Sequence, residues 1–159
     1  MKKAILIIVT VCSIGLIVIA FLGFGNYDHL QTIAYATENA APKSQSLCAR
    51  YVRKAIQAGG VRFIARPASA YKYADFLPVL GFEEIEEPYQ PGDIVVFNQT
   101  GGRKHGHIAI YTGKGWVSDF KQRSFYVHSD YISSKDYKVF RKEDGPYYNN
   151  LFKQLYILL

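Results

Sequence analysis

Cysteine is scarce in this sequence of 159 residues, which holds only Cys12 and Cys48. A domain of this length can bury a core without disulfide crosslinks, and two cysteines exclude a disulfide-rich scaffold. No CxxC pair exists, so the close ligand pairs of a structural zinc site are missing, and we expect neither a metal nor another cofactor. Nothing repeats along the chain, which argues against a solenoid.

Signatures of nucleic-acid binding are absent as well. The basic residues are scattered along the chain, and no zinc-finger, homeodomain or RNP motif occurs, so we expect no nucleic acid among the partners. Lysine and arginine nevertheless outnumber acidic residues by 19 to 13, which gives a net charge of +6. Without Lys2, Lys3 and Asp28 the charge falls by one, to +5. A moderately basic domain suits an anionic cell envelope.

One long hydrophobic run, residues 4–25, follows Lys2 and Lys3. The run is long enough to span a bilayer as a helix, and the positive charges before it place the N-terminus in the cytoplasm. The segment Ala34-Tyr35-Ala36 has the small-x-small pattern of a signal-peptidase site. We therefore predict that residues 1–36 are a signal peptide or membrane anchor with a short linker, and that residues 37–159 form a domain outside the inner membrane, periplasmic or extracellular. If cleavage does not occur, residues 4–25 anchor the domain in the membrane.

Helical patterns come first in the exported part, and strand patterns follow. Ser44 or Ser46 is expected to cap a helix that ends at Gly59-Gly60, with Cys48 on its buried face. A less regular helix is expected over residues 68–80. Strands are expected over residues 94–97, 107–112, 116–121, 127–132 and 137–141. The order predicts an α+β fold, with N-terminal helices packed on an antiparallel sheet.

Three residues in this arrangement have the chemistry of a thiol acyl-transfer site. Cys48 lies on the first turn of its helix, where free backbone N–H groups stabilise a thiolate. His107 begins a strand and is a candidate general base. A regular hairpin, with Thr112 opposite Trp116, would put Asp119 on the same face of the sheet as His107. Taken singly, each also has a plain structural interpretation: an inert buried thiol, a hydrogen-bonded strand histidine and a solvated acid.

These residues lie in segments that resemble those of a known superfamily. A cysteine at a helix start, then "PGDIVVF", then "GHIAIYTGKGWVSDF", resembles the NlpC/P60 and CHAP superfamily of papain-like peptidoglycan hydrolases. The resemblance implies a papain-like fold, with Cys48 as nucleophile, His107 as base and Asp119 as the residue that orients the base. An aspartate in the third place is similar to the amidase effectors of type VI secretion systems.

The resemblance implies an amidase or endopeptidase that cuts an amide bond in the stem peptide of peptidoglycan. Two alternatives remain open: a non-catalytic module that binds the cell envelope, and a thiol acyltransferase or transpeptidase on the same fold. Whether an inhibitor or immunity protein exists is not decided by the sequence.

Overall fold

The computed structural model describes residues 24–148 and 151–156. The predicted membrane or signal helix lies almost wholly outside these residues. Within the described ranges, no helix combines the length and hydrophobicity needed to cross a membrane.

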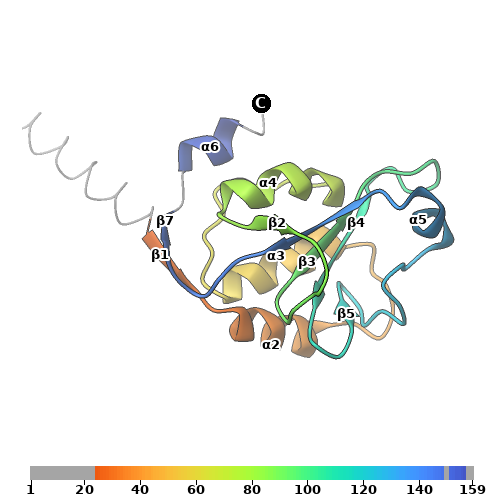
Figure 1. Cartoon of the computed structure of the whole chain (residues 1–159), viewed down its shortest axis with the longest axis horizontal. Helices are drawn as coiled ribbons and strands as arrows, with labels where there is room; N and C mark the ends of the chain where they lie inside the picture. Colours follow the sequence, from red (N-terminus) through yellow and green to blue (C-terminus); the bar gives the residue numbers. More distant parts are fainter. Residues whose placement is uncertain (1–23, 149–150, 157–159) are drawn as a thin grey trace, which may run out of the picture.

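The chain forms short helices and strands connected by long turns (Figure 1). The helices are α2 (His29–Asn39), α3 (Cys48–Ala58), α4 (Tyr73–Val79), α5 (Ser129–Ser134) and α6 (Leu151–Tyr156), with a 3-10 turn at Ala70–Lys72. The strands are β1 (Phe24–Tyr27), β2 (Glu83–Ile85), β3 (Ile94–Phe97), β4 (His107–Tyr111), β5 (Trp116–Val117), β6 (Tyr137–Arg141) and β7 (Gly145–Tyr148).

Five strands form the central sheet, in the order β2-β6-β3-β4-β5, and every neighbouring pair is antiparallel. Helices α3 and α4 cover one face of this sheet, and aromatic side chains from the loop before α5 cover the other. The predicted α+β arrangement, with N-terminal helices on an antiparallel sheet, is therefore confirmed.

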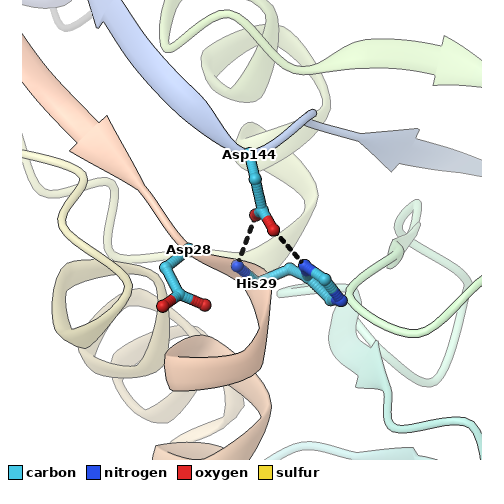
Figure 2. A group of neighbouring side chains, drawn as sticks. All are labelled: Asp28, His29 and Asp144. Atoms are coloured by element: carbon cyan, nitrogen blue, oxygen red, sulfur yellow. Dashed lines mark hydrogen bonds and ion pairs between the residues drawn. The ribbon is translucent and has the colours of Figure 1, made fainter.

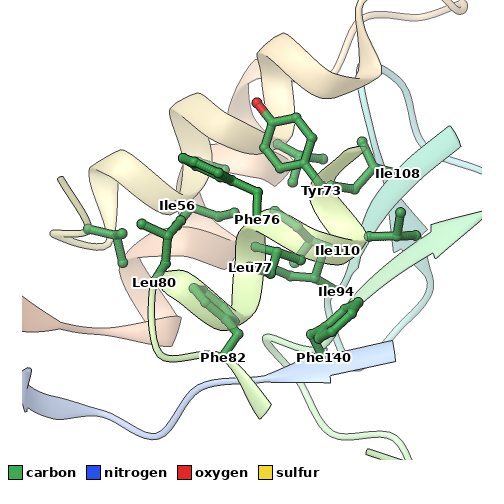
Figure 3. Close-up of a cluster of buried hydrophobic side chains, with 14 of the residues drawn as sticks. Ile56, Tyr73, Phe76, Leu77, Leu80, Phe82, Ile94, Ile108, Ile110 and Phe140 are labelled. Atoms are coloured by element: carbon green, nitrogen blue, oxygen red, sulfur yellow. The ribbon is translucent and has the colours of Figure 1, made fainter. Parts of the chain in front are cut away.

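Strand β3 explains how both faces are packed. Its four residues are all buried, because alternate side chains point to opposite faces of a sheet. Ile94 and Val96 join the core beneath the helices, whereas Val95 and Phe97 join the aromatic cluster on the other face. The helix-side core is shown in Figure 3, where Ile56, Phe76 and Leu77 meet Ile94, Ile110 and Phe140 of the sheet.

Three predicted elements differ from the structure. The strand expected over residues 116–121 is only the two-residue β5. Residues 127–132, expected as a strand, instead lead into helix α5, which buries Tyr131 against Phe97 at a ring separation of 4.7 Å. The helix expected over residues 68–80 is shorter and begins as a 3-10 turn before α4.

Residues expected to form a linker belong to the folded unit. Strand β1 pairs with β7, and α2 packs on α3. Asp28 caps α2 by accepting a hydrogen bond from the backbone of Gln31, while His29 bonds to Asp144 through both its backbone N–H and its ring Nδ1, each at 2.7 Å (Figure 2). The boundary predicted after residue 36 falls inside α2, and the cleavage itself stays a prediction.

A buried amide ties the C-terminal helix α6 to the domain. Gln154 accepts hydrogen bonds from the backbone N–H groups of Ile64 and Ala65, at 2.9 and 3.4 Å, and donates to the carbonyl of Arg62. These bonds dock the helix onto the loop that follows α3.

The aspartate of the "PGDIVVF" segment has a structural role. Asp93 is fully buried and accepts two hydrogen bonds from the guanidinium of Arg141, each at 2.7 Å, plus one from the backbone of Gln90.

We expect Asp93→Ala to lower the free energy of unfolding by about 3 kcal/mol, measured by urea denaturation, since it leaves the partly buried Arg141 without its carboxylate partner. Lys138→Ala, which breaks the exposed pair with Glu84, should cost at most about 1 kcal/mol. Equal losses in the two variants would contradict this role for Asp93.

Candidate active site

A cavity of about 490 Å³ lies at the start of α3, and all three predicted site residues line it. Cys48 comes from the first turn of α3, His107 from the first position of β4, and Asp119 from the turn after β5. The structure thus brings together side chains that are far apart in the sequence. The other lining residues are Ser44, Ser46, Gly102, Arg103, Lys104, His105, Gly106, Phe120, His128 and Tyr131.

Cys48 is partly buried and unpaired. Helix α3 puts it on the same side as Val52, Ala55 and Ile56, which are buried in the core, as the periodicity predicts. The predicted serine cap is wrong, because Leu47 is the N-cap residue and no side chain caps the helix. Ser46 instead has a left-handed backbone, with φ of 58°, in the turn that leads into α3.

The environment of Cys48 favours the neutral thiol. The pKa of the Cys48 thiol is raised to about 11, mainly by burial and in smaller part by the nearby charge of Asp119. Backbone N–H groups of Ile108, Ala49 and Cys48 itself lower this pKa, but each by less than burial raises it. The helix start therefore does not produce the resting thiolate that the sequence leads us to expect.

His107 is neutral for the same reason. Burial lowers the pKa of its imidazole to about 4, although the charge of Asp119 acts in the opposite direction. At neutral pH the site therefore holds an uncharged imidazole and an uncharged thiol.

The ring of His107 contacts an amide that the sequence analysis missed. Its Nε2 lies 2.6 Å from the side-chain nitrogen of Gln122. The Oε1 of Gln122 is buried and has no hydrogen-bond partner within the described residues. If the amide is turned end for end, Oε1 can accept a hydrogen bond from Nε2–H, which satisfies both groups.

Asp119 is 1% exposed and its hydrogen bonds go elsewhere. Its Oδ2 accepts from the backbone N–H groups of Gln45 and Leu47 and from the hydroxyl of Ser44, and its Oδ1 accepts from Ser118. Across the residues that the structure describes, no hydrogen bond or ion pair joins Asp119 to His107. The carboxylate thus orders the turn before Cys48, while the imidazole pairs with Gln122.

The hairpin register explains this outcome. Tyr111 lies opposite Trp116, one residue away from the predicted pairing of Thr112 with Trp116. The loop takes one more residue than expected, and Thr112 closes it by donating its backbone N–H to the carbonyl of Gly115. Strand β5 then ends at Val117, and a tight turn brings Gln122 back against Trp116, where its N–H donates to the Trp116 carbonyl. No sequence pattern signals that turn.

A possible metal-binding group lies outside the cavity. Ligand atoms of Asp28, His29 and Asp144 lie within 4.8 Å of one another (Figure 2). Asp28 already caps α2 and Asp144 already bonds to His29, so the hydrogen bonds of the fold account for their positions.

In papain-like proteins, the class to which NlpC/P60 hydrolases belong, a helix carries a thiol and packs on an antiparallel sheet that carries a histidine. Helix α3 with Cys48 and strand β4 with His107 have this arrangement. The chain is similar to a chain in the crystal structure of the type VI native effector-immunity complex Tae3-Tai3 from Ralstonia pickettii. The two are 41% identical with a TM-score of 0.69, over 74% of this chain and 100% of that chain. The selenomethionine form of the complex matches with 43% identity and a TM-score of 0.63, over 69% of this chain and 97% of that chain.

These matches show that the chain belongs to the Tae3 family of type VI effectors, and they confirm the resemblance to NlpC/P60 hydrolases and type VI amidase effectors. No protein-family model matches the chain, and no curated protein sequence matches it.

The pKa of Cys48 can be measured through its reactivity. In a Cys12→Ser variant Cys48 is the only thiol, and its rate of alkylation by iodoacetamide should keep rising through pH 9 towards an inflection near pH 11, because only the thiolate reacts. The same protein unfolded in urea should level off near the ordinary thiol pKa of 9.0. A folded-state plateau below about pH 8 would mean that the helix start outweighs burial.

Proposed function

We propose that the chain is a peptidoglycan amidase that hydrolyses an amide bond in a stem peptide. The observation that carries the proposal is a cavity lined by Cys48 and His107 in a chain that is 41% identical to a Tae3 structure over the whole length of that structure. Peptidoglycan lies outside the inner membrane, so the proposal requires delivery to the periplasm or cell surface.

The neutral pair defines the first chemical step. As the Sγ of Cys48 attacks the carbonyl carbon of the scissile amide, His107 takes the thiol proton, so charge separates only during the attack. Oxygen of the resulting tetrahedral intermediate carries negative charge, and the backbone N–H of Cys48 at the start of α3 is a donor for it.

The remaining steps return the site to its starting state. The imidazolium of His107 protonates the leaving amine as the carbon–nitrogen bond breaks, which leaves a thioester on Cys48. Water then gives a proton to His107 and attacks the thioester, so the acid is released and the thiol is restored.

Gln122 and Asp119 support this chemistry in different ways. A Gln122 carbonyl that accepts the Nε2–H of His107 fixes the tautomer in which Nδ1 is free to take the thiol proton. Asp119 holds the turn from Ser44 to Leu47 and so fixes the start of the helix that carries Cys48.

A protein partner also belongs to the proposal. The Tae3 structures are effector-immunity complexes, with Tai3 as the immunity protein. We infer that this chain likewise has an immunity protein that protects the cell which makes it.

Wall digestion tests the activity directly. The purified chain should release new peptide termini from peptidoglycan, detected by mass spectrometry, and Cys48→Ala should reduce the release to background because the nucleophile is gone. New crosslinks instead of new termini would favour the transferase alternative. Unchanged muropeptides with retained binding would favour the envelope-binding module.

Substitutions of Gln122 and Asp119 should differ in their effects on kcat and on the melting temperature. Gln122→Ala should lower kcat by about 10- to 100-fold while the melting temperature changes little, because general-base catalysis depends on the imidazole's orientation. Gln122→Glu keeps an acceptor and should restore part of kcat, and its carboxylate should move the acid limb of the pH profile upward by raising the His107 pKa. Asp119→Ala should lower the melting temperature as well as the activity. A Gln122→Ala variant with full kcat would return the orienting role to Asp119.

A further inference from the structure

A second cavity, of about 330 Å³, also borders Cys48. It shares Ser46, Cys48 and His105 with the first cavity, so the thiol borders both. A peptide whose scissile carbonyl lies at Cys48 thus has space on the protein surface in either cavity. The second cavity is lined further by Leu47, Ala49, Arg50, Arg53, Pro67, Ala68 and Ala70.

The charged side chains that line this second cavity are both positive. Arg50 and Arg53 line it, and none of the described residues that line it is acidic. In the first cavity, by contrast, Arg103 already has neighbours: its Nη2 lies 3.3 Å from the Nδ1 of His128, and its Nε lies 4.0 Å from a carboxylate oxygen of Asp130.

The guanidinium of Arg53 lies against a buried tyrosine. The Nε of Arg53 and the hydroxyl of Tyr73 are both buried, and neither has a hydrogen-bond partner elsewhere in the described part of the chain. Burial raises the pKa of Tyr73, whereas a hydrogen bond from Arg53 and the charge of Arg53 lower it, so the two groups lie close together. Tyr73 thus holds one side of the guanidinium, and the same Arg53 side chain lines the second cavity.

We propose that Arg53 forms a subsite for a carboxylate of the stem peptide, on the residue next to the scissile amide. A guanidinium binds a carboxylate through two parallel hydrogen bonds, which gives selectivity over a neutral amide of the same shape. Pro67, Ala68 and Ala70 provide an apolar wall for the aliphatic part of that residue, and the exposed Arg50 adds positive charge at the rim. This inference rests on the proposed amidase function and names the chemistry of its substrate.

Two synthetic stem peptides test the subsite, one with a free carboxylate next to the scissile amide and one with a carboxamide in its place. The full-length chain should cleave the carboxylate peptide with a kcat/KM about 10- to 100-fold higher. Arg53→Gln should remove most of that preference by slowing the carboxylate peptide alone. Arg53→Lys, which keeps the charge but loses the paired donors, should fall between. Lys54→Gln removes one charge from the exposed face of the same helix and should keep the preference.

Binding to a Cys48→Ala chain, measured by calorimetry, separates the subsite from the chemistry. Tighter binding of the carboxylate peptide, weakened by adding Arg53→Gln, supports the subsite. This holds even if the chain with its native Cys48 cleaves neither peptide. Absence of cleavage would overturn the proposed function but not the subsite. Equal binding of the two peptides overturns the subsite. A uniform loss in Arg53→Gln, for both peptides, also overturns it, because a purely structural role predicts no selectivity.

Discussion

The buried carboxylate of Asp119 is the constraint on which the site depends. It is 1% exposed and accepts hydrogen bonds from the turn at Ser44, Gln45 and Leu47. A buried charge is tolerated only when hydrogen bonds compensate it, so this carboxylate and this turn stabilise each other. Because the turn leads directly into α3, the same bonds fix the position of Cys48 relative to the sheet that carries His107.

That constraint has an electrostatic consequence. The charge of Asp119 favours a protonated imidazole and disfavours a thiolate, as the directions of the two pKa effects show. Burial acts on both groups in the direction of neutrality and is the larger effect for each. The site therefore rests without separated charge. In the mechanism we propose, the same carboxylate stabilises the imidazolium that forms during attack.

The sequence predicts the parts of this molecule that follow from local pattern. Buried strand β3, the inward face of α3 and the positions of Cys48 and His107 all follow from periodicity and from glycine and proline signals. The partner of His107 does not, because it depends on how many residues the hairpin loop takes, and one extra residue moves every later side chain to the other face. Gln122 reaches the imidazole only through a turn with no sequence signal. Helix α5 forms where a strand was expected because burial of Tyr131 against Phe97 decides the local conformation.

The packing of residues 24–36 bears on the predicted cleavage after Ala36. Cleavage after Ala36 would divide α2, remove the buried Tyr27 and Thr32, and delete β1, the strand that pairs with β7. It would also remove His29, which bonds to Asp144 at the turn between β6 and β7. A domain that began at Thr37 would therefore lose the buried side chains of Tyr27, Thr32 and Ala36 and the packing of α2 on α3. Of the two predicted fates of the N-terminal segment, retention as an anchor keeps these contacts, because residues 24–36 then remain covalently attached to the domain on which they pack.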